Sequence, residues 1–174
     1  MVIVLRHLAV VTYTVPAERV RPHLPARTAP YGEAGTAFIS AVSFVWDGGP
    51  SERVYEAGVQ LNYRTYVAEG GQPVAWFLGG VVSHPALAAL HRSLRTPWRA
   101  GSLRLEVSGE GATWCYHLTG SDGHGAVALE LAAGEGQVSE LAVALTAVAT
   151  GCARTAAGLV ALPVRHPPLE NRPC

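Results

Sequence analysis

The chain has 174 residues, of which 49% are hydrophobic and 15% charged, and thirteen acidic side chains balance thirteen basic ones. This length suits one domain, the hydrophobic content excludes an intrinsically disordered chain, and the charge lacks the basic excess of a nucleic-acid binder. All thirteen basic residues are arginine, so no lysine side chain is available for a Schiff base or for anchoring pyridoxal phosphate.

The first half of the chain is dominated by segments typical of β-strands. Val2–Val15 is rich in β-branched residues and predicts a strand. Pro16–Leu24 predicts a short helix, because proline suits a first helical turn. Three further strands are predicted at Thr36–Trp46, Ala57–Val67 and Val74–Val82.

The second half adds two helices and four strands to this pattern. The first helix is expected to be capped by Ser83 and to end before Thr96-Pro97, and the second to begin at Ser139 and to end near Thr150-Gly151. A last strand at Leu159–Val164 precedes a short polar tail from about residue 167. Three strands between the helices are predicted at Ser102–Ser108, Ala112–Thr119 and Ala126–Ala132.

This succession predicts a mainly β fold with short helices, an α+β architecture. The number of short strands favours a closed or nearly closed antiparallel β-barrel with helices at its ends. No linker or repeat divides the chain, so residues 1–174 are expected to form a single domain. The sequence shows no strongly apolar stretch of membrane-spanning length and no signal peptide, so we expect a cytoplasmic protein without a membrane partner.

Residues 102–108 show a regular alternation of apolar and polar side chains. Leu103, Leu105 and Val107 share one face of the predicted strand, and the polar side chains Arg104, Glu106 and Ser108 share the other. This pattern is typical of a strand with one buried face and one face in water.

Residues 60–67 alternate in the same way, and here two interpretations stay open. Gln60, Asn62, Arg64 and Tyr66 share one face, which lies either in water or inside the barrel. If it lies inside, the polar groups need partners, and an arginine beside amides and a phenol suits a carboxylate or carbonyl. The following segment, Val74–Leu78, is apolar on both faces, which favours the interior.

The string Leu61-Asn62-Tyr63-Arg64-Thr65-Tyr66-Val67, followed by Ala75-Trp76-Phe77, resembles the YqjF-like proteins, a family of unknown function. That family is placed in the acetoacetate decarboxylase-like superfamily. Pro16–Pro25, Thr36–Phe44 and Leu162–Pro168 are also similar to it, so the resemblance covers most of the chain. It implies a cone-like β-barrel that encloses a small-molecule pocket.

The chain departs from this pattern at two places that matter for chemistry. Acetoacetate decarboxylases carry paired lysines after a proline, and Trp98 and Arg99 stand in the segment that resembles theirs. YqjF-like sequences often carry glutamate where Gln60 stands here, and Glu56, four residues earlier, is the acidic residue that could enter the same pocket. The resemblance therefore implies the fold without Schiff-base decarboxylation.

We expect a site for a small carbonyl- or carboxylate-containing metabolite, with Arg64 as the anchor. Arg64, Tyr66 and Glu56 are the predicted catalytic residues, for lysine-independent lyase, dehydratase or cyclase chemistry in which Tyr66 and Glu56 carry protons. The predicted ligand-binding residues are Gln60, Asn62, Trp76, Trp98 and Arg99.

Two alternatives belong to other functional classes. The first is a non-catalytic binding or sensing protein, which the absent lysine and Gln60 favour. The second is a structural subunit whose apolar helix, Val138–Thr150, packs against a partner. The seven histidines lack the spacing of a metal motif, so no metal and no cofactor are expected, and homo-oligomerisation is compatible with every alternative.

Overall fold

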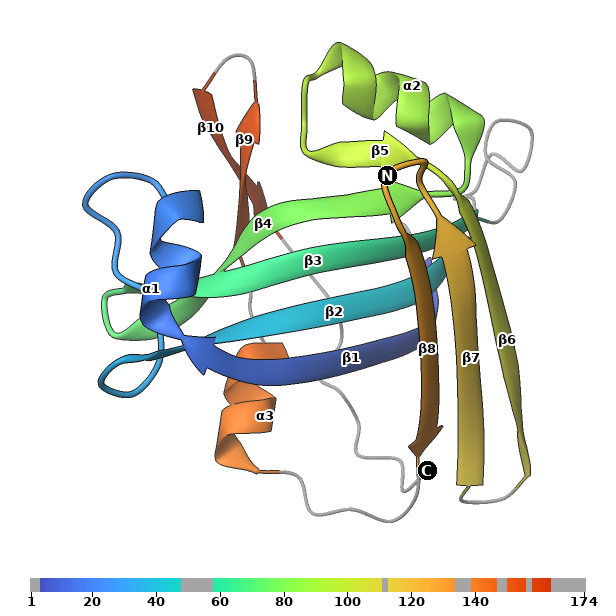
Figure 1. The fold of residues 1–174 in the computed structure, drawn as a ribbon, viewed down its shortest axis with the longest axis horizontal. Helices are drawn as coiled ribbons and strands as arrows, with labels where there is room; N and C mark the ends of the chain where they lie inside the picture. Colours follow the sequence, from blue (N-terminus) through green and yellow to red (C-terminus); the bar gives the residue numbers. More distant parts are fainter. Residues whose placement is uncertain are drawn as a thin grey trace.

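A computed structural model describes residues 4–47, 58–110, 113–133, 139–146, 150–155 and 158–163 (Figure 1). The helical segments are α1 (Ala17–Val20), the 3-10 turn η1 (Arg21–His23), α2 (Pro85–Ser93) and α3 (Glu140–Thr146). The strands are β1 (Val4–Pro16), β2 (Thr36–Asp47), β3 (Gly58–Glu69), β4 (Gln72–Val82), β5 (Trp98–Ala100), β6 (Ser102–Glu110), β7 (Thr113–Ser121), β8 (Ala126–Ala133), β9 (Thr150–Thr155) and β10 (Gly158–Pro163).

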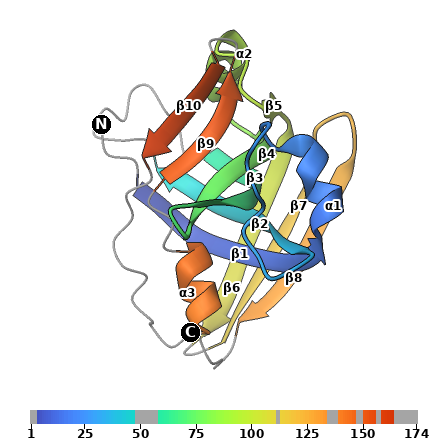
Figure 2. The same ribbon diagram turned by 90° about the vertical axis from the view of Figure 1, so that its left-hand side faces the viewer.

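The strands form two sheets. A seven-stranded sheet has the order β1-β2-β3-β4-β9-β10, with β5 also paired to β4, and a three-stranded sheet has the order β6-β7-β8. Neighbours from β1 to β4 are antiparallel, whereas β5 and β9 both run parallel to β4. Figures 1 and 2 show the three-stranded sheet lying across one side of the larger sheet, with β9, β10 and α3 on another side.

The mainly β fold with short helices agrees with the expectation, but the closed antiparallel barrel does not. Among the described strands neither sheet closes on itself, and in the larger one β1, β10 and the short β5 each pair with one neighbour only. The parallel pairs have a simple cause at β5. The chain passes through α2 between β4 and β5, and a crossover connection of this kind returns the chain parallel, unlike a hairpin.

The two longer helices differ from their predicted limits. His84, and not Ser83, caps α2, because its Nδ1 accepts a hydrogen bond of 3.4 Å from the N–H of Leu87. The Ser83 hydroxyl instead accepts one of 2.9 Å from the N–H of Val59 on β3. The second predicted helix ends at Thr146, and Thr150–Thr155 forms β9, whose pairing with β4 and β10 is a long-range interaction that local sequence does not reveal.

One face of β3, called here the apolar face, carries Leu61, Tyr63, Thr65 and Val67. At one end it packs against the three-stranded sheet in a cluster that includes Leu61, Val81, Leu103 and Leu118. At the other end it packs against α1 and η1 in a cluster that includes Val20, Leu24, Val67 and Trp76. Each fully buried side chain of this kind contributes roughly 1.5–3 kcal/mol.

The opposite face of β3, called the polar face, carries Gln60, Asn62, Arg64 and Tyr66. It is covered by α2, β5, β9 and α3 (Figure 2). At one end of this face, a buried cluster contains Phe77, Val82, Ala88, Trp98 and Ala153. Around Tyr66, a second cluster contains Phe38, Ala75 and Leu145. The polar face therefore lies between the large sheet and these covering elements.

A β-bulge interrupts the pairing of β3 with β4. Tyr63 pairs with Gly79, whereas the next residue, Arg64, pairs with Phe77, so Leu78 is an extra residue in β4. The bulge changes the phase of β4: Gly80 lies on the polar face with Asn62, and Phe77 lies on that face with Arg64. In the described part of the chain, no helix is long and apolar enough to cross a membrane.

Candidate functional site: the polar face of β3

Burial distinguishes between the two interpretations of the polar face. Gln60 is 9% exposed, Asn62 is 7% exposed, and Tyr66 is fully buried. Arg64 is half-buried. The polar face thus lies inside the protein, where each polar group requires a hydrogen-bond partner.

Asn62 is the centre of one hydrogen-bonded group, called here the amide cluster and made of Gln60, Asn62 and Trp98. The indole Nε1 of Trp98 donates to Asn62 Oδ1 over 2.6 Å, and Gln60 Nε2 donates to the same oxygen over 2.8 Å. Because an indole N–H can only donate, the Asn62 atom that faces it must be the oxygen. Among the described residues, the Asn62 NH₂ group and the Gln60 carbonyl oxygen then have no partner.

Glycine at position 80 allows the indole of Trp98 to reach Asn62. Gly80 pairs with Trp98, and a Cβ at Gly80 would lie 2.6 Å from Trp98 Cδ1 and 2.6 Å from the carbonyl oxygen of Leu61. The indole also contacts the ring of Phe77 at 5.1 Å and stacks on the imidazole of His91 at 4.9 Å, measured between ring centroids. The indole is therefore fixed by contacts on several sides.

The tautomer of His91 follows from its contact with Thr96. The Thr96 hydroxyl donates to the carbonyl oxygen of His91 over 3.1 Å, so the 2.8 Å contact with His91 Nδ1 must have the imidazole as donor. Burial lowers the pKa of His91 below its ordinary value. A neutral imidazole therefore stacks behind Trp98.

A second group, called the Arg–Tyr row, consists of Thr12, Ser40, Arg64 and Tyr66 and crosses three strands. Arg64 Nε donates to the Tyr66 hydroxyl over 3.0 Å. The Tyr66 hydroxyl lies 2.8 Å from Ser40 Oγ, which lies 2.7 Å from Thr12 Oγ1. Since arginine only donates, the simplest order of donors runs from Arg64 through Tyr66 and Ser40 to Thr12, at the exposed edge strand.

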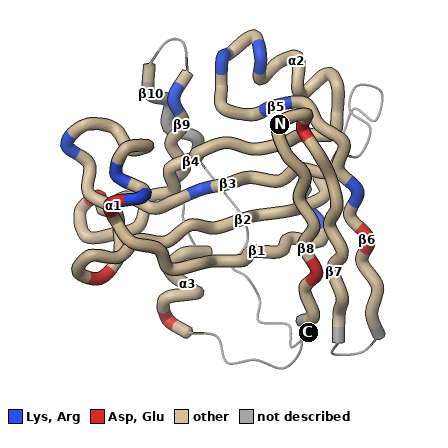
Figure 3. The backbone as a smooth tube through the Cα atoms, viewed as in Figure 1, with Lys and Arg blue, Asp and Glu red and all other residues tan. Residues whose placement is uncertain are grey.

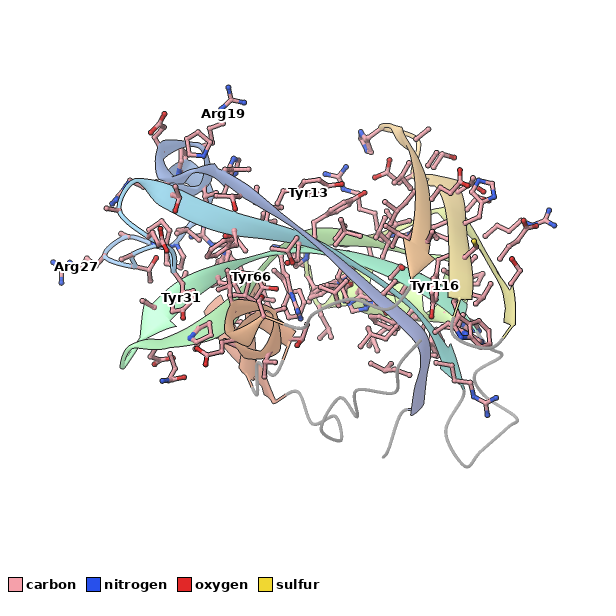
Figure 4. The ribbon with its side chains drawn as sticks, turned by 90° about the horizontal axis from the view of Figure 1, so that it is seen from below. Tyr13, Arg19, Arg27, Tyr31, Tyr66 and Tyr116 are labelled. Carbon is pink, nitrogen blue, oxygen red and sulfur yellow. The ribbon has the colours of Figure 1, made fainter. Side chains whose placement is uncertain are left out.

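Arg64 also joins the sheet to α3. Its Nη2 donates to the carbonyl oxygen of Leu145 over 3.0 Å, within the last turn of α3, where carbonyls lack helical partners and a cation is favourable. Figure 4 places Tyr66 beside α3, and the guanidinium carbon of Arg64 lies 5.3 Å from the centre of the Tyr66 ring. A guanidinium has five N–H donors, so Arg64 keeps donors for a further group.

The long strands around Arg64 carry little charge. Figure 3 shows the charged residues gathered mainly in connections, helices and β6–β8, with few on β1–β4. Among the described residues, no carboxylate forms an ion pair with Arg64. Within the described part of the chain, the groups that bond Arg64 are dipoles, namely the Tyr66 hydroxyl and the Leu145 carbonyl.

Two other predicted site residues do not join the polar face, and the place of a third is not described. Trp76 lies on the opposite face of the sheet, where its Nε1 donates to the carbonyl oxygen of His23 over 3.0 Å. Arg99 is exposed, and its guanidinium lies 3.9 Å from an oxygen of Asp122. Glu56 lies outside the described residues. The bulge in β4 explains Trp76, because it reverses the face on which this residue lies relative to Gly80.

The residues that complete both groups were missing from the sequence prediction. Ser40 and Thr12 complete the Arg–Tyr row, and His91 supports Trp98. Ser40 gave one weak signal, since it stands with Ser43 in the otherwise apolar strand β2, and both serines are buried. Nothing in the sequence places Thr12 beside Ser40 before the register of β1 and β2 is known.

Two cavities lie away from the amide cluster and the Arg–Tyr row. One of about 290 Å³ lies at the outer edge of β4, and one of about 240 Å³ lies between the two sheets beside Tyr63 and Asp122. Burial and, to a smaller extent, the Asp122 carboxylate raise the pKa of Tyr63. Among the described residues, no group of three or more His, Cys, Asp or Glu side chains is placed to hold a metal ion.

Three solved structures of MppR, an enduracididine biosynthesis enzyme, share this fold. The structure with HEPES buffer bound has a TM-score of 0.63 at 15% identity, covering 88% of this chain and 64% of that one. The complex with the condensation product of pyruvate and imidazole 4-carboxaldehyde gives 0.63 at 15%, covering 88% and 66%. The pyruvate complex gives 0.61 at 15%, covering 83% and 60%.

The chain thus spans less than two thirds of the length of the MppR chains that it matches, and at this identity the likeness concerns the fold. No curated protein matches the sequence. A family model does: DUF2071, described as an uncharacterized conserved protein, matches residues 3–174. The chain belongs to the DUF2071 family of uncharacterised conserved proteins.

Proposed function

We propose that the polar face of β3 binds a small metabolite with a carboxylate or carbonyl group, in an acetoacetate decarboxylase-like fold of the YqjF-like type. The observation that carries the proposal is the amide cluster. Asn62 Oδ1 is held by two donors, which turns the NH₂ group of Asn62 away from both of them and leaves it without a partner among the described residues. This NH₂ group can donate hydrogen bonds to a carboxylate or carbonyl oxygen of a ligand.

Arg64 supplies the second binding group in this proposal. It follows Asn62 directly on the same face of β3. Its N–H groups that are not engaged by Tyr66 and Leu145 can donate two hydrogen bonds to a carboxylate. The pyruvate complex of MppR supports this ligand class by likeness of fold. Trp98 and Phe77 would form the apolar wall beside the ligand.

Any reaction at this site proceeds without a Schiff base, because the chain contains no lysine. Arg64 and Asn62 would polarise a carbonyl oxygen, as donors do in lyase, dehydratase or cyclase chemistry. The Tyr66 hydroxyl would take a proton from the substrate while it gives its own proton to Ser40, which in turn gives one to Thr12. Glu56 is proposed as the second proton carrier, on the basis of its place in the sequence.

A non-catalytic binding or sensing function is the second candidate. Tyr66 favours it, because its hydroxyl is fully buried and already bonded to both Arg64 and Ser40. Such a hydroxyl holds the arginine in position without any need to transfer a proton. Gln60, which cannot act as an acid or base, favours the same function.

Thermal unfolding with pyruvate, longer 2-oxo acids and neutral acetone tests the binding proposal. A ligand at a hundred times its dissociation constant adds about 2.7 kcal/mol to the unfolding free energy. Asn62→Asp keeps the accepting oxygen but replaces the donors by a negative charge, and Gln72→Glu adds the same charge at an exposed position. We expect 2-oxo acids to stabilise the wild type and Gln72→Glu, but not Asn62→Asp.

Equal stabilisation of all three proteins, or no stabilisation by any anion, would contradict the proposal. Once a ligand is found, its turnover is followed by NMR. Turnover that disappears in Tyr66→Phe while binding persists supports the enzyme, and binding without turnover supports the sensing protein. The family match over residues 3–174 supports one domain, for which we expect a single cooperative unfolding transition.

A further inference from the structure

The cavity at the outer edge of β4 occupies a break in strand pairing. On this side β4 pairs with β9 at Ala75 and Trp76 and with β5 from Gly80 onward. Residues 77–79 between them have no paired strand there among the described residues, and Leu78 is also the extra residue of the bulge. The cavity of about 290 Å³ lies in this notch.

Six of the eight described residues that line the cavity are apolar, and they come from three parts of the chain. Trp76 and Phe77 are largely buried, and Leu24 packs in the same cluster as Trp76. Trp76 is held in place by its 3.0 Å hydrogen bond to the His23 carbonyl. The apolar lining consists of Pro22, Leu24, Trp76, Phe77, Leu78 and Pro97. Flat aromatic and proline surfaces of this kind suit a planar apolar group.

Arg154 of β9 gives the cavity a positive charge. It is exposed and lines the cavity, and within the described ranges it has neither an ion pair nor a side-chain hydrogen bond. His23 also lines the cavity. None of the described residues that line the cavity is acidic. An anion is therefore the favoured polar group at this position.

We propose that this notch, lined by Trp76, Leu78 and Arg154, is a second ligand site, for a small monocarboxylate with a planar apolar body. The body packs on Trp76 and Pro97, and the carboxylate accepts hydrogen bonds from the guanidinium of Arg154. Trp76 and Leu24 lie on the opposite side of the sheet from Asn62 and Arg64, and Phe77 is the residue that the notch shares with the polar face.

Two indole N–H signals of a two-dimensional NMR spectrum lie in different sites, with Phe77 between them in contact with Trp98. Trp76 lines the notch, whereas the Trp98 indole is bonded to Asn62. The two signals are assigned with Trp76→Phe and Trp98→Phe variants. Benzoate is the probe, and benzamide is its neutral control of the same shape. Pyruvate, added separately, tests the polar face through Trp98.

We expect benzoate to shift the Trp76 signal in a saturable way and benzamide to shift it far less. Arg154→Gln should weaken benzoate binding at least about tenfold, as expected for the loss of a charged hydrogen bond, while Arg92→Gln, at an exposed position of α2, should change it less than about twofold. The proposal is overturned if benzoate leaves Trp76 unchanged, if benzamide binds equally well, or if Arg154→Gln retains full affinity. Failure of pyruvate to shift Trp98 concerns only the polar face.

Discussion

Strands β3 and β6 have the same alternating pattern, yet they lie in opposite environments. In β6 the apolar side chain Leu103 is buried, while Arg104 and Glu106 are exposed and form a 2.6 Å ion pair in water. In β3 both faces are covered, and the polar one contains Asn62 and Tyr66 with almost no exposure. Alternation therefore shows which residues share a face, but the neighbouring strands determine whether water reaches it.

The energetic roles of the two polar faces should differ accordingly. An exposed ion pair contributes roughly 0–1 kcal/mol, because water competes for both charges. A buried polar group that loses its partner costs about 1–3 kcal/mol, since no water replaces the lost bond. Four experiments test whether the polar face of β3 behaves as a buried network and that of β6 as a solvated surface.

Gly80→Ala is expected to have the largest effect. The new Cβ would lie 2.6 Å from both Trp98 Cδ1 and the Leu61 carbonyl oxygen, so the indole must leave Asn62 or the backbone must move. We expect a loss of about 3 kcal/mol in the unfolding free energy, measured by chemical denaturation. Gly125→Ala, where a Cβ meets nothing within 4 Å, is the control. Equal effects of the two variants would mean that Trp98 is loosely held.

Arg64→Gln compared with Arg104→Gln is the most direct test of the difference between the strands. The change at Arg64 removes hydrogen bonds to Tyr66 and Leu145 and should cost about 2 kcal/mol, whereas the change at Arg104 should stay within about 0.5 kcal/mol. Denaturation curves of the two variants give both values. Similar small losses would show that water reaches both arginines.

Tyr66→Phe should have a slightly smaller effect. The change removes the Tyr66 hydroxyl, so Arg64 Nε and Ser40 Oγ each lose one hydrogen bond. We expect a loss of about 1.5 kcal/mol. Tyr13→Phe is the matched control, because Tyr13 lies on β1 with 58% of its surface exposed and should lose less than about 0.5 kcal/mol. A neutral result at Tyr66 would contradict the directed row of hydrogen bonds.

The smallest expected effect is a pH dependence from His91. Burial lowers its pKa in the folded state, so below its ordinary value of 6.5 the unfolded chain binds more protons than the folded one. The unfolding free energy should therefore fall as the pH decreases from about 7.5 to about 5.5, and less so in His91→Gln. Exposed His23→Gln should keep the wild-type slope. If His91→Gln also keeps it, the imidazole is already protonated or accessible to water.

The parts of the fold that the sequence predicted are those governed by local pattern. Proline and glycine mark the ends of β1, β2 and β4 closely, and the shared face of Gln60, Asn62, Arg64 and Tyr66 follows from the period of a strand. The open sheet, β5 and β9 were missed because each depends on which distant strand lies alongside. Local residues carry almost no information on that choice.

The same limit explains the candidate site. Asn62 and Trp98 are 36 positions apart. The sequence predicted that both line one pocket, but not that they bond to each other. Trp76 was expected there too, but the extra residue in β4 turns it to the other face. Ser40 and Thr12 belong to β2 and β1, and only the register of these strands brings them to Tyr66.

The bulge at Leu78 changes which residues of β4 share a face. On one side of it odd-numbered residues face Arg64, and on the other side even-numbered residues face Asn62. Deleting Leu78 would bring Phe77 next to Gly79 and restore regular alternation, so the other side chains of β4 would keep their present faces. A deletion elsewhere in β4 would instead move every side chain on one side of it to the opposite face. In β4 the effect of an insertion or deletion therefore depends on its position relative to the bulge, which absorbs one residue without changing the face of the others.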